Sequence, residues 1–61
     1  MSLTLVNLVE DHRIISEEYY LHWSEAFWEA ESIAMRAYAH RGQYHTIVEI
    51  HDSQHGIRVM P

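Results

Sequence analysis

The sequence predicts an α+β domain with the element order ββαββ, in which one helix packs on one face of a small antiparallel sheet. Two observations predict this class. Short β-branched and apolar stretches lie toward both ends of the chain, and the middle carries apolar residues at alternating spacings of three and four. The first pattern is typical of strands and the second of a helix with one apolar side. At 61 residues the chain has room for one domain, so we assign residues 1–61 to a single domain.

The first element is a strand over residues 3–9, LTLVNLV, followed by a polar break at 10–12, EDH. The next segment, RIISEEYYL at residues 13–21, fits two structures. As a strand, it pairs back on the first strand across the polar break. As a helix, it begins at Ser16 and has two glutamates in its first turn, where acidic side chains are favourable.

From Ser24 onward the helical pattern is clear. Ser24 is a preferred N-cap residue, Glu25 suits the first turn, and Gly42 suits the position just after the helix. The apolar residues span an arc of about 140° on a helical wheel, which is wide enough to lie on a sheet. They are Trp23, Ala26, Phe27, Ala30, Ile33, Ala34, Ala37 and Tyr38.

The C-terminal part predicts a second hairpin. Residues 43–50, QYHTIVEI, alternate in polarity and form its first strand. The residues expected on the inward face of that strand are Tyr44, Thr46, Val48 and Ile50. Residues 52–56, DSQHG, form the turn, and a short last strand follows with Ile57 and Val59 facing inward.

The second architecture is βαββ, with one long helix over residues 16–41. Tyr19 and Tyr20 then continue the apolar stripe of the helix, which supports this alternative. Such a helix is about 39 Å long, whereas the available strands reach roughly 17–27 Å. One chain cannot cover a helix of that length, so the alternative requires a dimer. We therefore favour ββαββ.

Composition and charge exclude several classes of protein. The chain is 48% hydrophobic and 21% charged, a balance typical of globular domains. The net charge is −5, with four separated arginines and no lysine, which excludes direct binding to nucleic-acid backbones. The apolar run LTLVNLV is too short to cross a bilayer, so no membrane association is expected.

The chain contains no cysteine, which excludes disulfides, thiolate zinc sites and cysteine nucleophiles. A reducing compartment suits such a chain, and we expect a cytoplasmic protein. A domain of this size is marginally stable unless it oligomerises, binds a partner or packs an unusually good core.

Two apolar residues of the helix lie outside its inward arc. Trp28 and Met35 are seven residues apart, so they form an apolar strip along the flank of an otherwise polar face. Glu25, Glu29 and Glu31 surround this strip. Tryptophan is enriched at binding hot spots and methionine adapts to irregular surfaces. These five residues are the predicted partner-binding surface, and their acidic rim suits a basic partner.

The chemistry available for catalysis or metal binding is sparse. His51, Asp52 and His55 flank the second turn and are the only weak candidates for a metal site. Ser53 lies between them, but residues adjacent on one turn rarely converge into a catalytic triad, and two glycines leave little for an oxyanion-hole loop. We therefore expect no cofactor, no metal and no enzymatic activity.

Residues 29–56, EAESIAMRAYAHRGQYHTIVEIHDSQHG, carry a helix with spaced alanines into a strand and a turn that ends in glycine. In this layout the chain resembles the small acidic inhibitors that bacteriophages make against host machinery, such as the phage inhibitor of bacterial RNA polymerase and several anti-CRISPR proteins. The resemblance covers about half of the chain. It implies a phage-encoded, non-enzymatic protein that binds and blocks a bacterial enzyme or defence complex in the host cytoplasm.

Two functions follow as hypotheses. The first is an inhibitor that binds a bacterial protein through the strip and its acidic rim. The second is a self-associating small protein, such as a structural or antitoxin-like subunit, in which the same helix packs against its own copy as a homodimer.

Overall fold

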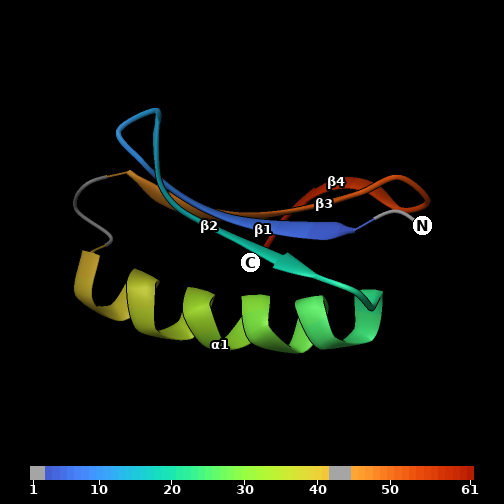
Figure 1. Ribbon diagram of the computed structural model, residues 1–61. Helices are drawn as coiled ribbons and strands as arrows, with labels where there is room; N and C mark the ends of the chain where they lie inside the picture. The colour runs from blue at the N-terminus through green and yellow to red at the C-terminus, as the bar shows by residue number, and fades with distance from the viewer. Residues whose placement is uncertain (1–2, 42–44) are drawn as a thin grey trace.

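A computed structural model describes residues 3–41 and 45–61 of the chain. Its elements are β1 (Thr4–Glu10), β2 (Arg13–Tyr20), α1 (Trp23–Arg41), β3 (Thr46–Asp52) and β4 (Gly56–Val59). The four strands form one antiparallel sheet in the order β2-β1-β3-β4. The helix runs along one face of this sheet (Figure 1). The predicted α+β class with the order ββαββ is confirmed, and the alternative with a helix from residue 16 is wrong.

The hairpin between β1 and β2 explains why residues 13–20 form a strand. Asp11 and His12 both have positive φ angles, of 50° and 67°. Two successive residues in this region are typical of the two-residue turn whose twist matches that of paired strands. Pairing then runs from Glu10 opposite Arg13 to Thr4 opposite Tyr20, with one irregularity between Leu8 and Val9.

The helix begins two residues earlier than predicted, since a cap at Ser24 makes Glu25 the first helical residue. α1 begins at Trp23, and the amide of Ala26 donates a hydrogen bond to the carbonyl of His22 over 3.0 Å. The prediction that Ser24 caps the helix is therefore wrong. The Trp23 ring stacks on His55 at 4.0 Å, and this tertiary contact holds the first helical residue in place. The predicted glycine after the helix, Gly42, lies outside the described residues.

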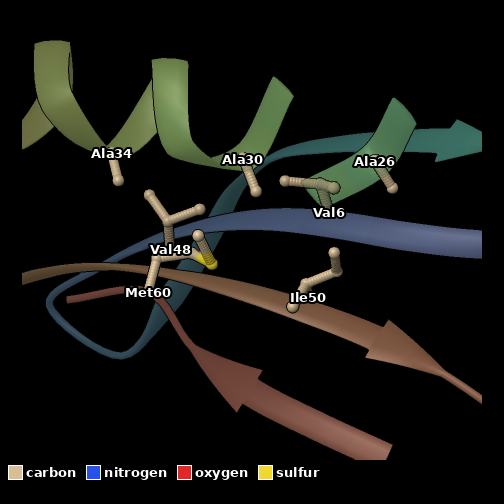
Figure 2. Close-up of a cluster of buried hydrophobic side chains, with 7 residues drawn as sticks. All are labelled: Val6, Ala26, Ala30, Ala34, Val48, Ile50 and Met60. Carbon is tan, nitrogen blue, oxygen red and sulfur yellow. The ribbon is translucent and has the colours of Figure 1, made fainter. Parts of the chain in front are cut away.

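Small side chains bring the helix close to the sheet. Ala26, Ala30 and Ala34 face Val48 and other sheet residues, and all are buried (Figure 2). Among the described residues, the cluster consists of Val6, Ala26, Ala30, Ala34, Val48, Ile50 and Met60. Larger, partly buried residues pack around this cluster; they are Leu8, Tyr20, Trp23, Phe27, Ile33 and Tyr38. The predicted helical stripe is thus confirmed as the inward face of α1.

The register of β4 differs from the prediction. Arg58 pairs with the buried Ile50, so Arg58 lies on the helix side of the sheet. Ile57 and Val59 therefore face the opposite side and are 67% and 56% exposed. The prediction that they face inward is wrong, because the length of the preceding turn sets the register and a shift of one residue reverses both faces of a strand. On β3, by contrast, Thr46, Val48 and Ile50 face inward as predicted, whereas Tyr44 lies outside the described residues.

A tyrosine hydroxyl joins the helix to the end of the β3–β4 hairpin. The Met60 amide donates to the Val48 carbonyl over 2.8 Å, which continues the pairing beyond β4. The reciprocal bond is replaced by the Tyr38 hydroxyl, which accepts from the Val48 amide at 3.0 Å and donates to the Met60 carbonyl at 2.7 Å. One side chain therefore satisfies two backbone groups and positions Met60 in the core.

Because the helix lies close to the sheet, enlarging a buried alanine of α1 should destabilise the protein more than enlarging an exposed alanine of the same helix. Ala30→Leu should lower the free energy of unfolding by about 1–3 kcal/mol, because the added atoms have no space between α1 and the sheet. Ala39→Leu, the same change at an exposed position of the same helix, should alter it by less than about 0.5 kcal/mol. Urea unfolding measures both. Equal effects of the two substitutions would contradict the packing.

The bridging hydroxyl predicts a second stability difference. Tyr38→Phe should destabilise the protein by about 1–3 kcal/mol, because a backbone donor and a backbone acceptor lose their partner. Tyr19→Phe removes a hydroxyl from a side chain that is 61% exposed and serves as the matched control, with little expected effect. Urea unfolding of both variants tests this, and an unchanged Tyr38→Phe variant would show that the bridge contributes nothing.

Candidate functional site

The outer face of α1 carries the predicted strip. Trp28 is 66% exposed and Met35 is 75% exposed, so both side chains present most of their surface to solvent. The two residues lie two helical turns apart, on the side of α1 that faces away from the sheet. Large apolar side chains at this level of exposure are candidates for contacts with another molecule. Their role as partner contacts stays a prediction.

Acidic residues surround the strip as expected from the sequence. Glu25 and Glu31 are exposed and Glu29 is half-buried. Their negative charge extends to the adjacent end of β2, where the pKa of Tyr20 is raised. Partial burial of the phenol is the main cause, and the negative charges of Glu29, Glu18 and Glu25 add to it. The first half of α1 and the end of β2 therefore form one acidic region.

A groove lies beside the strip, between the helix and the C-terminal residues. Its volume is about 290 Å³, and its lining is Phe27, Glu31, Ala34, Met35, Met60 and Pro61. It occurs where β4 has ended and Met60 turns in under the helix (Figure 2). The strip residue Met35 and the rim residue Glu31 are thus also groove residues. Sequence patterns carried no signal for this groove, because it depends on where residues 60 and 61 come to lie.

The three weak metal candidates do not converge on one ion. His51 lies on the sheet face opposite the helix, where its Nε2 is 3.1 Å from Oε1 of Glu49. Asp52 and His55 form a separate pair, with His55 Nδ1 at 2.9 Å from Asp52 Oδ1. Within residues 3–41 and 45–61, no three histidine or acidic side chains gather in a geometry that would hold a metal.

The Asp52–His55 pair instead connects three parts of the fold. Asp52 accepts hydrogen bonds from the Thr4 hydroxyl at the start of β1 and from the backbone amides of Gln54 and His55. The His55 ring stacks on Trp23, and the Arg58 guanidinium lies 5.6 Å from the centre of the same indole. These contacts join the second turn to the first strand and to the start of the helix.

These hydrogen bonds perturb the titration of Asp52. The Thr4 hydroxyl, followed by the His55 side chain, holds the pKa of the Asp52 carboxyl well below its usual range. An orienting carboxylate beside an imidazole also occurs in catalytic triads. The Trp23 ring covers one face of this imidazole, so the pair holds the second turn against the start of the helix and is called here the clamp.

A second surface is the sheet face opposite the helix, called here the open face. Figure 1 shows α1 on one side of the sheet, and no described helix or strand covers the other side. Alternation from the buried residues assigns its members, since directly paired residues share a face. They are Leu5, Asn7, Val9, Ile14, Glu17, Tyr19, Ile47, Glu49, His51, Ile57 and Val59. Sequence reasoning missed this surface because it assigned Ile57 and Val59 to the core.

The centre of the open face is polar, and its Asn7 is shielded from water. Asn7 is 3% exposed, and its Oδ1 has no hydrogen-bond partner among the described residues. Its Nδ2 lies 3.5 Å from Nε2 of His51, which in turn pairs with Glu49. Rows of apolar side chains lie on both sides of this centre along the strands, with Leu5 in one row and Val9 in the other.

Comparisons with known proteins gave no match: no family model, no curated protein and no solved structure is similar to the chain. Within the described residues, α1 lacks the combination of length and apolar character that a bilayer-crossing helix requires. The functional argument therefore rests on the surfaces of the chain itself.

The clamp predicts a loss of stability in acid. Because the folded-state pKa of Asp52 is lowered, its contribution is present above the ordinary carboxyl pKa of about 4 and is lost as pH falls below it. Asp52→Asn should therefore be less stable than the original chain at pH 5, and the difference should shrink toward pH 2.5. Urea unfolding at both pH values measures this.

The control is Asp11→Asn, which changes an exposed aspartate in the first turn. Its stability difference from the original chain should stay small at both pH values. A difference for Asp52→Asn that is equal at pH 5 and pH 2.5 would contradict the clamp.

Proposed function

We propose that this chain is a non-enzymatic protein-binding protein that engages its partner through the outer face of α1. One observation carries the proposal, namely that Trp28 and Met35 are the two most exposed large apolar side chains on the helix. Burying them against a partner removes apolar area from water, the main favourable term in association. The neighbouring groove offers a recess into which a partner side chain can insert.

The charge of this surface indicates the kind of partner. Glu25, Glu29 and Glu31 lie around the strip. Burial is the main cause of the raised pKa of Tyr20, and the negative charges of Glu29, Glu18 and Glu25 add to it. An acidic rim around an apolar centre suits a partner surface with arginine or lysine around an apolar recess. Complementary charge of this kind accelerates association and rejects acidic partners.

The resemblance to small acidic phage inhibitors suggests what such binding achieves. A bacterial enzyme or defence complex that handles nucleic acid presents basic clefts, and an acidic protein seated there blocks the cleft. On this proposal the protein is phage-encoded, acts in the bacterial cytoplasm and requires no cofactor. Its activity is occlusion, which needs a stable shape and a complementary surface but no catalytic group.

The test separates binding from folding. In a pull-down from bacterial lysate, Trp28→Ser combined with Met35→Ser should reduce recovery of the specific partner by at least about tenfold, because two central anchors are removed. Circular dichroism and urea unfolding establish that the variant is folded. The matched control is Leu3→Ser combined with Leu21→Ser, which removes two exposed leucines that lie outside α1.

The expected result is loss of capture in the helix variant and retention in the control. Mass spectrometry then identifies the partner, and its inhibition is measured with the purified proteins. If the folded variant with both helix substitutions still captures the specific partner as well as the original chain does, the proposal is wrong.

A further inference from the structure

We propose that the open face of the sheet is the docking surface for a second copy of this chain. The two sheets pack face to face in a symmetric dimer, and the two helices lie on the outside. This inference goes beyond the proposed function and does not rest on it, because it concerns the opposite side of the molecule from Trp28.

The first argument is the apolar area of the open face. Four of its apolar side chains are more than half exposed, those of Ile14, Tyr19, Ile57 and Val59. They lie on both sides of the polar centre and at its β4 end, so face-to-face packing of two copies would remove the largest exposed apolar side chains of this sheet face from water together. Exposed apolar side chains grouped on one face are candidates for contact with another molecule.

The second argument is that the polar groups at the centre of the face have partners within the chain. Asn7 is already almost completely shielded from water, and the side chains of His51 and Glu49, which are 32% and 25% exposed, pair with each other. Covering the face therefore removes apolar surface from water and leaves the pair of His51 and Glu49 intact. This is the condition under which burial favours association.

The third argument is charge, which decides between a copy and other occupants. The face carries no arginine, and its carboxylate at Glu49 lies 3.1 Å from Nε2 of His51 in the same chain. The other carboxylate, Glu17, lies on the edge strand β2. A two-fold axis parallel to the strands places β2 over β4 of the second copy, so the two Glu17 side chains are kept apart. The same axis sets Tyr19 over Ile57 of the second copy, because both residues belong to the row of Leu5.

Other routes to self-association are electrostatically worse. Two copies that met through the outer face of α1 with their helices parallel would bring Glu25, Glu29 and Glu31 against the same residues of the second copy. Two copies that paired through the edge of β2 would bring together Glu17 and Glu18, which lie near the middle of that strand. Like charges in direct opposition disfavour both arrangements.

The fourth argument is the small size of the core. The helix contributes only alanines to the buried cluster, and the sheet contributes Val6, Val48 and Ile50. With no cysteine in the chain, disulfides cannot supplement this core. Domains of this size are commonly stabilised by oligomerisation. A second copy of the chain is always available as a partner, because it is present at the same concentration.

The experiment is a measurement of mass in solution by light scattering and sedimentation, from 5 to 200 µM. The original chain should be a dimer over most of this range, and its melting temperature should rise with concentration. Ile57→Glu combined with Val59→Glu should be a folded monomer, because it places charge in the middle of the apolar area. Trp28→Glu combined with Met35→Glu is the matched control on α1 and should remain a dimer.

A milder variant guards against misfolding. Ile57→Ser combined with Val59→Ser should weaken dimerisation at least tenfold while preserving the circular dichroism spectrum of the original chain. An original chain that is monomeric up to 200 µM would overturn the proposal. So would a dimer that survives the glutamate pair on β4 but is lost with the glutamate pair on α1, since that result assigns the interface to the helix.

Discussion

A single helix can cover only one face of a sheet, and this constraint shapes the whole molecule. Alanines at the contact allow α1 to lie close to β1 and β3, so a few buried side chains suffice for a core. The same arrangement leaves the other face of the sheet without cover from the described residues (Figure 1). Everything that the chain presents to other molecules follows from this one-sided packing.

The molecule therefore has two separate surfaces that point in opposite directions. The outer face of α1 combines exposed apolar residues with acidic neighbours, whereas the open face of the sheet combines apolar rows with a polar centre around the buried Asn7. Their different chemistry suits different occupants, a basic partner on the helix and a second copy on the sheet. If both contacts form, one dimer presents two identical partner-binding helices on its outside.

The sequence predicted the elements that depend on local periodicity. The helical stripe, the first strand, the strand that follows the helix and the break at residues 10–12 were readable, because alternation and three-four spacing reflect which side of an element is buried. Residues 13–21 fitted both a strand and a helix, and only the length of the alternative helix favoured the strand. The start of the helix could not be predicted from local patterns, because the stack of Trp23 on His55 joins residues that are far apart in the chain. The prediction that Ile57 and Val59 face inward was also wrong, because the length of the preceding turn sets the register of the strand. The groove at Met60 depends on the Tyr38 hydroxyl, which no local pattern reveals.

The most direct test of this one-sided packing is a dilution series followed by two-dimensional amide NMR of the isotopically labelled protein. The account predicts that, between 10 µM and 1 mM, signals of open-face residues such as Asn7, Tyr19 and Val59 shift together with concentration. Signals of Trp28 and Met35 on the outer face of α1 should stay unchanged. Concentration-dependent shifts confined to the helix, or no shifts at all, would contradict it.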